Sequence, residues 1–94
     1  MKSFSVKVEF FGVPRLRAGV ADFFVEVAAD RNRLGDVLMK IQREIPELTK
    51  ECFADGKLRK EYVVNVSGKE FTRSLGRVVS PGDSLLIMSS DAGG

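Results

Sequence analysis

The sequence contains no histidine and no tryptophan, and it has a single cysteine and a single tyrosine. Without an imidazole, the chain cannot build the Ser-His-Asp or Cys-His arrangements, which need a base that titrates near neutral pH. One cysteine cannot form an internal disulfide, and without histidine it matches none of the usual zinc-binding spacings. We therefore expect no metal site, and many classes of enzyme are excluded. We interpret Cys52 as a small buried hydrophobic residue, and the alternative is a redox or acyl-transfer thiol.

Long apolar runs and a strong excess of one charge are also missing. No stretch approaches the roughly 20 apolar residues of a membrane-spanning helix, and residues 1–7 alternate instead of forming the apolar core of a signal peptide. The 15 basic and 13 acidic residues leave a net charge of only +2, which does not favour a nucleic-acid partner. We expect a cytoplasmic protein that binds neither membranes nor nucleic acid.

The composition is that of an ordinary folded domain, with 44% hydrophobic and 30% charged residues, and 94 residues allow one core. Three segments alternate apolar and polar side chains with the period of a half-buried strand: residues 3–11, 22–28 and 61–67. Residues 85–88 are continuously apolar and predict a buried last strand after a turn at residues 81–83.

Apolar residues at spacings of three and four predict one main helix over residues 33–45. The residues of this stripe are Leu34, Val37, Leu38, Ile41 and Ile45. Asp30 or Asn32 is available to cap the start of the helix, and Pro46 is expected to end it. We interpret residues 15–19 as a loop, residues 55–56 as a turn and residues 71–79 as short irregular structure.

This order of elements predicts an α+β domain over residues 1–88, in which the helix packs across one face of a mixed sheet of four to five strands. The first and last strands are both hydrophobic and are expected to pair at the centre of the sheet. Residues 89–94 offer no apolar anchor and are predicted to form a flexible tail.

The last two residues, Gly93 and Gly94, lack the Cβ that would hinder an extended backbone from entering a narrow channel in a partner. The alternative is that the glycine pair is only a frayed end. Beside this tail we predict an exposed apolar patch of Phe11, Leu86 and Met88, because these residues lie on the outward side of the first and last strands. A loop that covers the patch is the competing interpretation.

Three segments together resemble the β-grasp ubiquitin-like proteins, and within them the MoaD and ThiS sulfur carriers of molybdenum-cofactor and thiazole synthesis. The resemblance covers nearly the whole chain. Residues 8–12 with Arg15 and Gly19 are similar to the family's first strand and following loop, and Leu34, Val37 and Leu38 match its helix. Pro81-Gly82-Asp83 through Ala92-Gly93-Gly94 is similar to its closing segment.

The resemblance implies a sulfur carrier that binds no cofactor itself. A MoeB- or ThiF-like partner would use ATP to adenylate the Gly94 carboxylate, and a sulfur donor would convert it to a thiocarboxylate. Gly93, Asp91 and Ala92 would enter the partner with Gly94. Phe11, Leu86 and Met88 would pack against the activating enzyme and a MoaE-like larger subunit of molybdopterin synthase in turn.

Several alternatives remain open at this point. A ubiquitin-like modifier joined to lysines through Gly94 shares the activation step, and a ThiS-like or tRNA-thiolation carrier differs only in the acceptor of the sulfur. An interaction module with an inert tail is the third. The family often has an asparagine where this chain has Ser67-Gly68, and prolines where it has residues 89–91, so the sequence leaves the pathway undecided.

Overall fold

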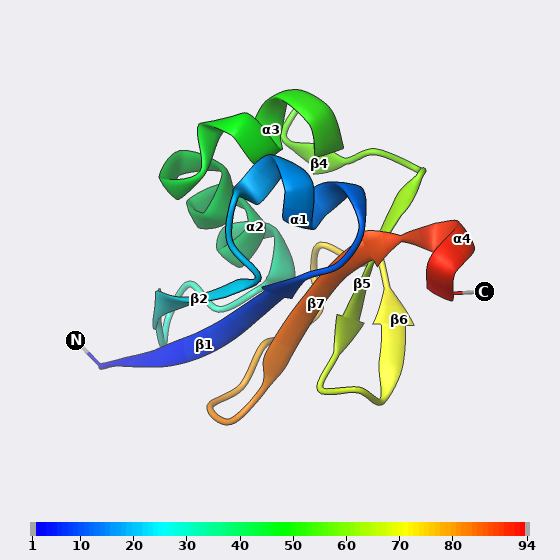
Figure 1. Cartoon of the computed structure of the whole chain (residues 1–94). Helices are drawn as coiled ribbons and strands as arrows, with labels where there is room; N and C mark the ends of the chain where they lie inside the picture. Colours follow the sequence, from blue (N-terminus) through cyan, green and yellow to red (C-terminus); the bar gives the residue numbers. More distant parts are fainter. Residues whose placement is uncertain (1, 94) are drawn as a thin grey trace.

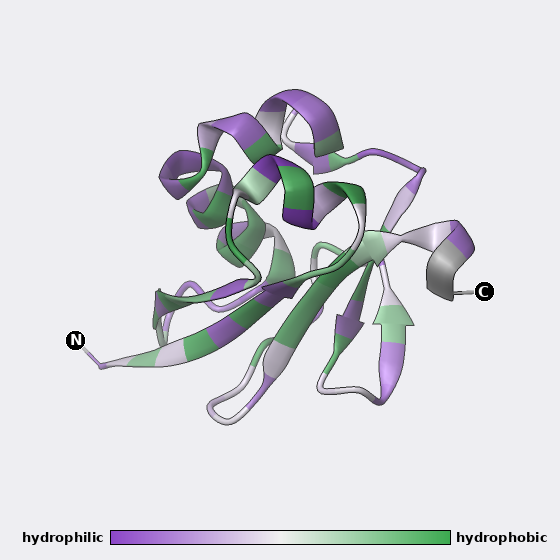
Figure 2. Ribbon diagram, viewed as in Figure 1, coloured by the Kyte–Doolittle hydropathy of each residue, from purple (hydrophilic) through white to green (hydrophobic). Residues whose placement is uncertain are grey.

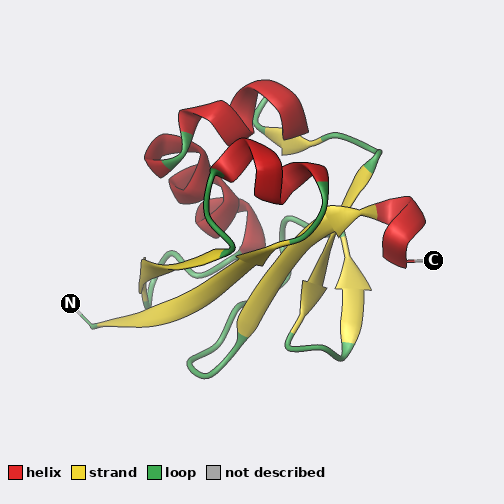
Figure 3. Cartoon of the chain, viewed as in Figure 1, coloured by secondary structure: helices red, strands yellow, loops and turns green. Residues whose placement is uncertain are grey.

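A computed structural model describes residues 2–93 and shows a sheet with three helices on one face, followed by a helical turn near the end of the chain (Figures 1 and 3). The five strands of the sheet lie in the order β2-β1-β7-β5-β6. Their bounds are β1 Ser3–Phe10, β2 Asp22–Ala28, β5 Tyr62–Val66, β6 Glu70–Thr72 and β7 Ser84–Ser89. The α+β, β-grasp fold predicted from the sequence is confirmed.

The first and last strands lie side by side at the centre of the sheet, as predicted. β1 and β7 are parallel, with Val8 opposite Leu85 and Phe10 opposite Ile87. β2 pairs with the other edge of β1 and β5 with the other edge of β7, both in antiparallel orientation. In Figure 2 β7 is coloured hydrophobic along most of its length, which agrees with its central place.

The core lies between the sheet and α2, which spans Leu34–Glu44. The predicted apolar stripe of this helix faces the sheet, and Leu34, Val37, Leu38 and Ile41 are almost completely buried. Burying an aliphatic side chain of this size stabilises the fold by about 1.5–3 kcal/mol. The periodic pattern identified the helix because these contacts, rather than local propensity, hold it in place.

The start of α2 differs from the prediction. The N-cap is Arg33, whose backbone N–H donates to the Asp36 carboxylate at 3.2 Å. Asn32 instead forms two hydrogen bonds with Val79. The Asn32 Nδ2 donates to the Val79 carbonyl at 3.2 Å, and the Val79 N–H donates to the Asn32 carbonyl at 2.8 Å. Contacts with a segment 47 residues away therefore displace the cap that local sequence favours.

Two helices occupy segments where none was predicted. α1 spans Val13–Ala18, within a region interpreted as a loop, and α3 spans Pro46–Cys52 and so begins at the proline that was predicted to end the main helix. Each has a proline in its first turn, a position where the missing N–H costs nothing. Both are too short to show a clear period, and they pack on each other. A two-residue hairpin of β3 (Phe53–Ala54) and β4 (Lys57–Leu58) follows and confirms the predicted turn at residues 55–56.

The turn before β7 is also confirmed. The Asp83 N–H donates to the Ser80 carbonyl at 3.0 Å, and Gly82 between them has a φ of 91°, which favours glycine. The Asp83 carboxylate accepts hydrogen bonds from the Ser80 N–H at 2.9 Å and from the Ser67 hydroxyl at 2.7 Å. Both hydrogen bonds lower the pKa of Asp83, and the bond from the Ser80 N–H has the larger effect. The ionised carboxylate thus ties the turn to the end of β5.

We expect Asp83→Asn to lower the free energy of unfolding at pH 7 by about 1–2 kcal/mol, since a charge-assisted bond is lost. A carboxylate with a lowered pKa stabilises the fold above its unfolded pKa of about 4, and this contribution disappears as pH falls through the lower folded pKa. Urea unfolding at pH 7 and pH 3 measures the free energy of unfolding, and the difference between variant and wild type should be smaller at pH 3. Asp22→Asn at the exposed start of β2 is the control, and a constant gap contradicts this role for Asp83.

Within residues 2–93, no helix has both the length and the apolar character needed to cross a membrane.

Candidate functional site

The residues that lead toward Gly94 leave the sheet from its central strand. β7 ends at Ser89, opposite Tyr62, and Ser90 is held against the start of β5 because its N–H and its hydroxyl both donate to the Glu61 carbonyl, at 2.8 and 3.1 Å. Ser90–Gly93 form the helical turn α4, and Asp91 is exposed. Gly94 lies outside the described residues, as do the side-chain positions of residues 92–93. The flexibility of residues 89–94 stays a prediction.

The face of the sheet that the helices leave uncovered carries an apolar cluster beside this exit. We define the outer-face cluster as Phe11, Val63, Phe71, Leu86 and Met88. Met88 pairs with Val63, and Asn65 lies between Leu86 on β7 and Phe71 on β6. The Phe11 N–H donates to the Ile87 carbonyl at 3.1 Å, which fixes Phe11 beside the end of β7. The cluster therefore extends from the residue that follows β1 across β7 and β5 to β6.

The exposure of these side chains corrects part of the predicted patch. Phe11 is 53% exposed and Leu86 is partly exposed, as expected for a docking surface. Met88 is only 8% exposed, so its predicted place on the surface is wrong. Met88 lies opposite Val63 of β5, on the strand between β1 and β5. Met88 forms the floor of the cluster, and Phe11 forms part of its rim.

Val63, Asn65 and Phe71 were missed from the sequence. Phe71 is 52% exposed and lies on β6, in a segment interpreted as irregular. The sequence feature that could have revealed β6 is the turn at Ser67 and Gly68. Both residues have a positive φ, and the turn returns the chain alongside β5. Asn65 is 9% exposed, and its amide gives an otherwise apolar row one polar point that can orient a partner.

A cationic side chain reinforces the junction from which the tail departs. The Arg73 guanidinium donates to the Arg59 carbonyl at 3.2 Å and also to the Lys60 carbonyl. Ser90 is bonded to the adjoining residue, Glu61. The connection into β5 is thus held from two sides, which gives the tail a defined point of departure.

No other group in the described part of the chain provides an obvious reactive centre. Cys52 is completely buried, and burial raises the pKa of its thiol to about 11, so it is protonated at neutral pH. This agrees with its interpretation as a buried hydrophobic residue. Among residues 2–93, no cluster of three or more His, Cys, Asp or Glu side chains is arranged to hold a metal ion.

No protein-family model and no curated protein matches the sequence. Solved structures do match. SAMP1 from Haloferax volcanii is 28% identical with a TM-score of 0.74, over 90% of this chain and 93% of that chain. A putative molybdopterin converting factor, subunit 1, from Pyrococcus furiosus is 23% identical with a TM-score of 0.74, over 92% of this chain and 97% of that one.

This chain has the ubiquitin-like β-grasp fold of these proteins and is similar to SAMP1. The fold also occurs in the BexX/CysO complex of Amycolatopsis orientalis, in which a chain is 21% identical with a TM-score of 0.65, over 89% of this chain and 93% of that one. SAMP1 of Haloferax volcanii is, as its name says, a small archaeal modifier protein.

Proposed function

We propose that this MoaD/ThiS-like protein is a sulfur carrier for molybdopterin biosynthesis, whose Gly94 carboxylate is adenylated by a partner enzyme and converted to a thiocarboxylate. The observation that carries the proposal is the joint position of two features at one end of β7. The chain leaves the sheet toward Gly94 at Ser89, and the outer-face cluster lies beside the same strand end. A partner that docks on the cluster has the tail within reach.

The chemistry explains why a partner must act first. A terminal carboxylate has a pKa near 3.5 and is ionised at neutral pH, so it resists attack by sulfur. Adenylation joins it to the α-phosphate of ATP and releases pyrophosphate. Sulfide then attacks the carbonyl carbon, AMP leaves with the C–O bond electrons, and a thiocarboxylate remains on Gly94.

The helical turn α4 must open for this reaction. Helical backbone advances about 1.5 Å per residue and extended backbone about 3.3 Å, so unwinding residues 89–94 gives a reach of roughly 20 Å. A single turn is a marginal structure in isolation, and opening it costs little. The bonds from Ser90 to Glu61 keep the base of the tail in place while the end extends.

Two partners fit this proposal: a MoeB- or ThiF-like adenylating enzyme that supplies ATP, and a MoaE-like larger synthase subunit. The likeness to a molybdopterin converting factor subunit supports the second partner, and the complex of CysO with BexX supports the general use of a partner protein by this fold. Both partners would meet Phe11 and Leu86 over Met88, and a hydrogen bond to the Asn65 amide would orient them.

A second candidate is a protein modifier joined to lysines through Gly94. The observation that favours a modifier is the likeness to SAMP1, a small archaeal modifier protein, at 28% identity. Adenylation is common to both candidates, and they differ in the nucleophile that attacks the acyl-adenylate. Sulfide gives a thiocarboxylate, whereas a lysine amine gives an isopeptide bond.

Intact-mass spectrometry separates these candidates. The chain, made to end at Gly94, is incubated with ATP, sulfide and the adenylating enzyme of the source organism. We expect the mass shift of one sulfur-for-oxygen replacement, located at the C-terminus by fragmentation. Lysine-linked adducts in cell extracts without this shift favour the modifier, and an unchanged mass with every candidate enzyme of the organism rejects both.

A further inference from the structure

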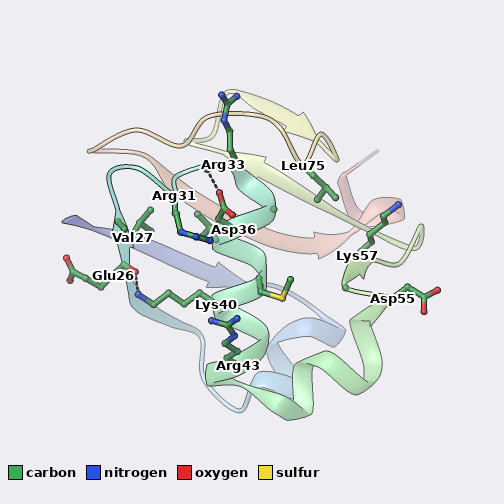
Figure 4. Close-up of a pocket in the computed structure, with 15 residues that line it drawn as sticks. Glu26, Val27, Arg31, Arg33, Asp36, Lys40, Arg43, Asp55, Lys57 and Leu75 are labelled. Carbon is green, nitrogen blue, oxygen red and sulfur yellow. Dashed lines mark hydrogen bonds between the residues drawn. The ribbon is translucent and has the colours of Figure 1, made fainter. Parts of the chain in front are cut away.

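A groove of about 680 Å³ crosses the solvent side of α2, on the face of the domain opposite the outer-face cluster. Its walls are residues 26–28 of β2, the exposed side of α2, the turn at residues 55–57 and Leu75 (Figure 4). A volume of this size accommodates several side chains of a bound segment. Neither the tail nor the outer-face cluster contributes to its lining.

The groove is positively charged. Its cationic side chains are Arg31, Arg33, Lys40, Arg43 and Lys57, and its carboxylates are Glu26, Asp36 and Asp55. The excess of two positive charges equals the net charge of the whole chain, +2, so the rest of the surface is balanced. Figure 4 shows Arg31, Lys40 and Arg43 along one flank of α2.

These cations are not neutralised by the domain itself. None of the five forms an ion pair with a carboxylate among residues 2–93. The Arg33 side chain donates to the Gly76 carbonyl at 2.8 Å, and the Lys40 side chain donates to the Glu26 carbonyl. These hydrogen bonds position the two side chains without cancelling their charges. The groove thus presents ordered positive charge to an incoming anionic group.

The middle of the groove is apolar. The Gly35 N–H donates to the Leu75 carbonyl at 2.9 Å, and a Cβ on Gly35 would lie only 3.3 Å from the Leu75 Cβ, so glycine permits this close packing. Met39 follows Gly35 by one helical turn on the same side of α2. Met39 is 47% and Leu75 37% exposed. An adaptable apolar surface therefore lies between basic walls.

We propose that this groove is a docking site for an acidic peptide segment of a partner protein, with an apolar side chain on Met39 and Leu75 and carboxylates on the basic walls. A peptide fits better than a nucleic acid, because none of the 15 described lining residues is aromatic and bases would find no stacking surface. Because the groove is on the opposite face from the outer-face cluster, an acidic partner and an activating enzyme can bind at once.

The probe is a fluorescein-labelled synthetic peptide rich in Glu and Asp with two central leucines, compared with a peptide of the same charge in which serines replace the leucines. Fluorescence anisotropy with the full chain should show tighter binding of the leucine peptide, and the affinity should fall as salt is raised from about 50 to 300 mM. Amide shifts in NMR spectra should be concentrated in residues 26–43 and 55–57.

The test variant is Arg31→Glu with Arg43→Glu, and the matched control is Lys2→Glu with Lys69→Glu, which changes the net charge equally at exposed positions outside the groove. We expect at least about a tenfold loss of affinity in the first and less than about twofold in the second. Met39→Ser should remove the preference for the leucine peptide.

Each remaining outcome overturns the inference. Equal affinity losses in both double variants show non-specific attraction, and shifts centred on β7 show that the peptide binds the outer-face cluster. Absence of binding by the leucine peptide rejects the groove as a peptide site. Oligouridylate that binds the groove as tightly, with the same dependence on Arg31 and Arg43, identifies a nucleic-acid site instead. None of these results bears on thiocarboxylate formation at Gly94, so the two proposals stand or fall separately.

Discussion

Deletion of Gly94 should abolish adenylation by the partner enzyme while leaving the folded domain as stable as before. The shortened chain still ends in a glycine carboxylate, but that carboxylate stops about 3.3 Å short of the α-phosphate. A displacement of even 1 Å from the reactive geometry costs roughly a hundredfold in rate. ATP–pyrophosphate exchange measures this step directly, and we expect no signal above that of the enzyme without carrier.

The same reasoning provides the controls. A chain with one extra glycine after Gly94 overshoots by the same distance and should also fail, which separates an effect of position from an effect of residue type. Glycine has no side chain to bury, so the thermal midpoint should change by less than about 2 °C in both variants. Full exchange activity in the shortened chain refutes the proposed role of Gly94, and a large fall in the midpoint shows that the deletion acts through folding.

Phe11→Asp should weaken binding of the adenylating enzyme by about thirtyfold or more. Phe11 is 53% exposed at the edge of the outer-face cluster, next to the end of β7. An aromatic side chain that a partner buries commonly contributes about 2 kcal/mol or more, and a carboxylate in its place would be desolvated without a compensating charge. Isothermal titration calorimetry of the full chain with the enzyme gives the dissociation constants.

Phe24→Asp is the matched control. Phe24 is 65% exposed and lies on the same face of the sheet, but on β2, opposite Lys7 and away from β7. It should change the affinity by less than about threefold, because scattered exposed apolar residues carry little binding energy. If Phe11→Asp and the wild-type chain bind the enzyme with equal affinity, the proposed docking surface is wrong. If Phe11→Asp and Phe24→Asp lose affinity equally, the enzyme contacts the whole outer face of the sheet.

The two proposed binding surfaces lie on different faces of the domain. The outer face of the sheet combines an apolar cluster with the point of departure of the tail, and the solvent side of α2 combines basic walls with an apolar floor. The sheet and the core separate them. Under the two proposals, an activating enzyme and an acidic partner would contact different residues on different faces of the domain.

Local pattern predicted the elements that are buried on one side. The alternation in residues 3–11, 22–28 and 61–67 and the stripe of α2 all survive in the structure, because burial of one face imposes a period of two or about 3.6. Cys52 was also interpreted correctly as a buried residue. The pairing of β1 with β7 followed from their hydrophobicity, since strands covered on both edges lie at the centre of a sheet.

What the sequence determined by itself was the fold and its candidate reactive end, through hydrophobic period and through Gly93 and Gly94. Only the tertiary structure decided the short helices α1 and α3, the N-cap at Arg33, the burial of Met88 and the joining of Phe71 to the outer-face cluster. It alone gathered distant cations into the α2 groove. The physical reason is that short elements, caps and surfaces depend on contacts between residues far apart in the chain, and a local period carries no information about those contacts.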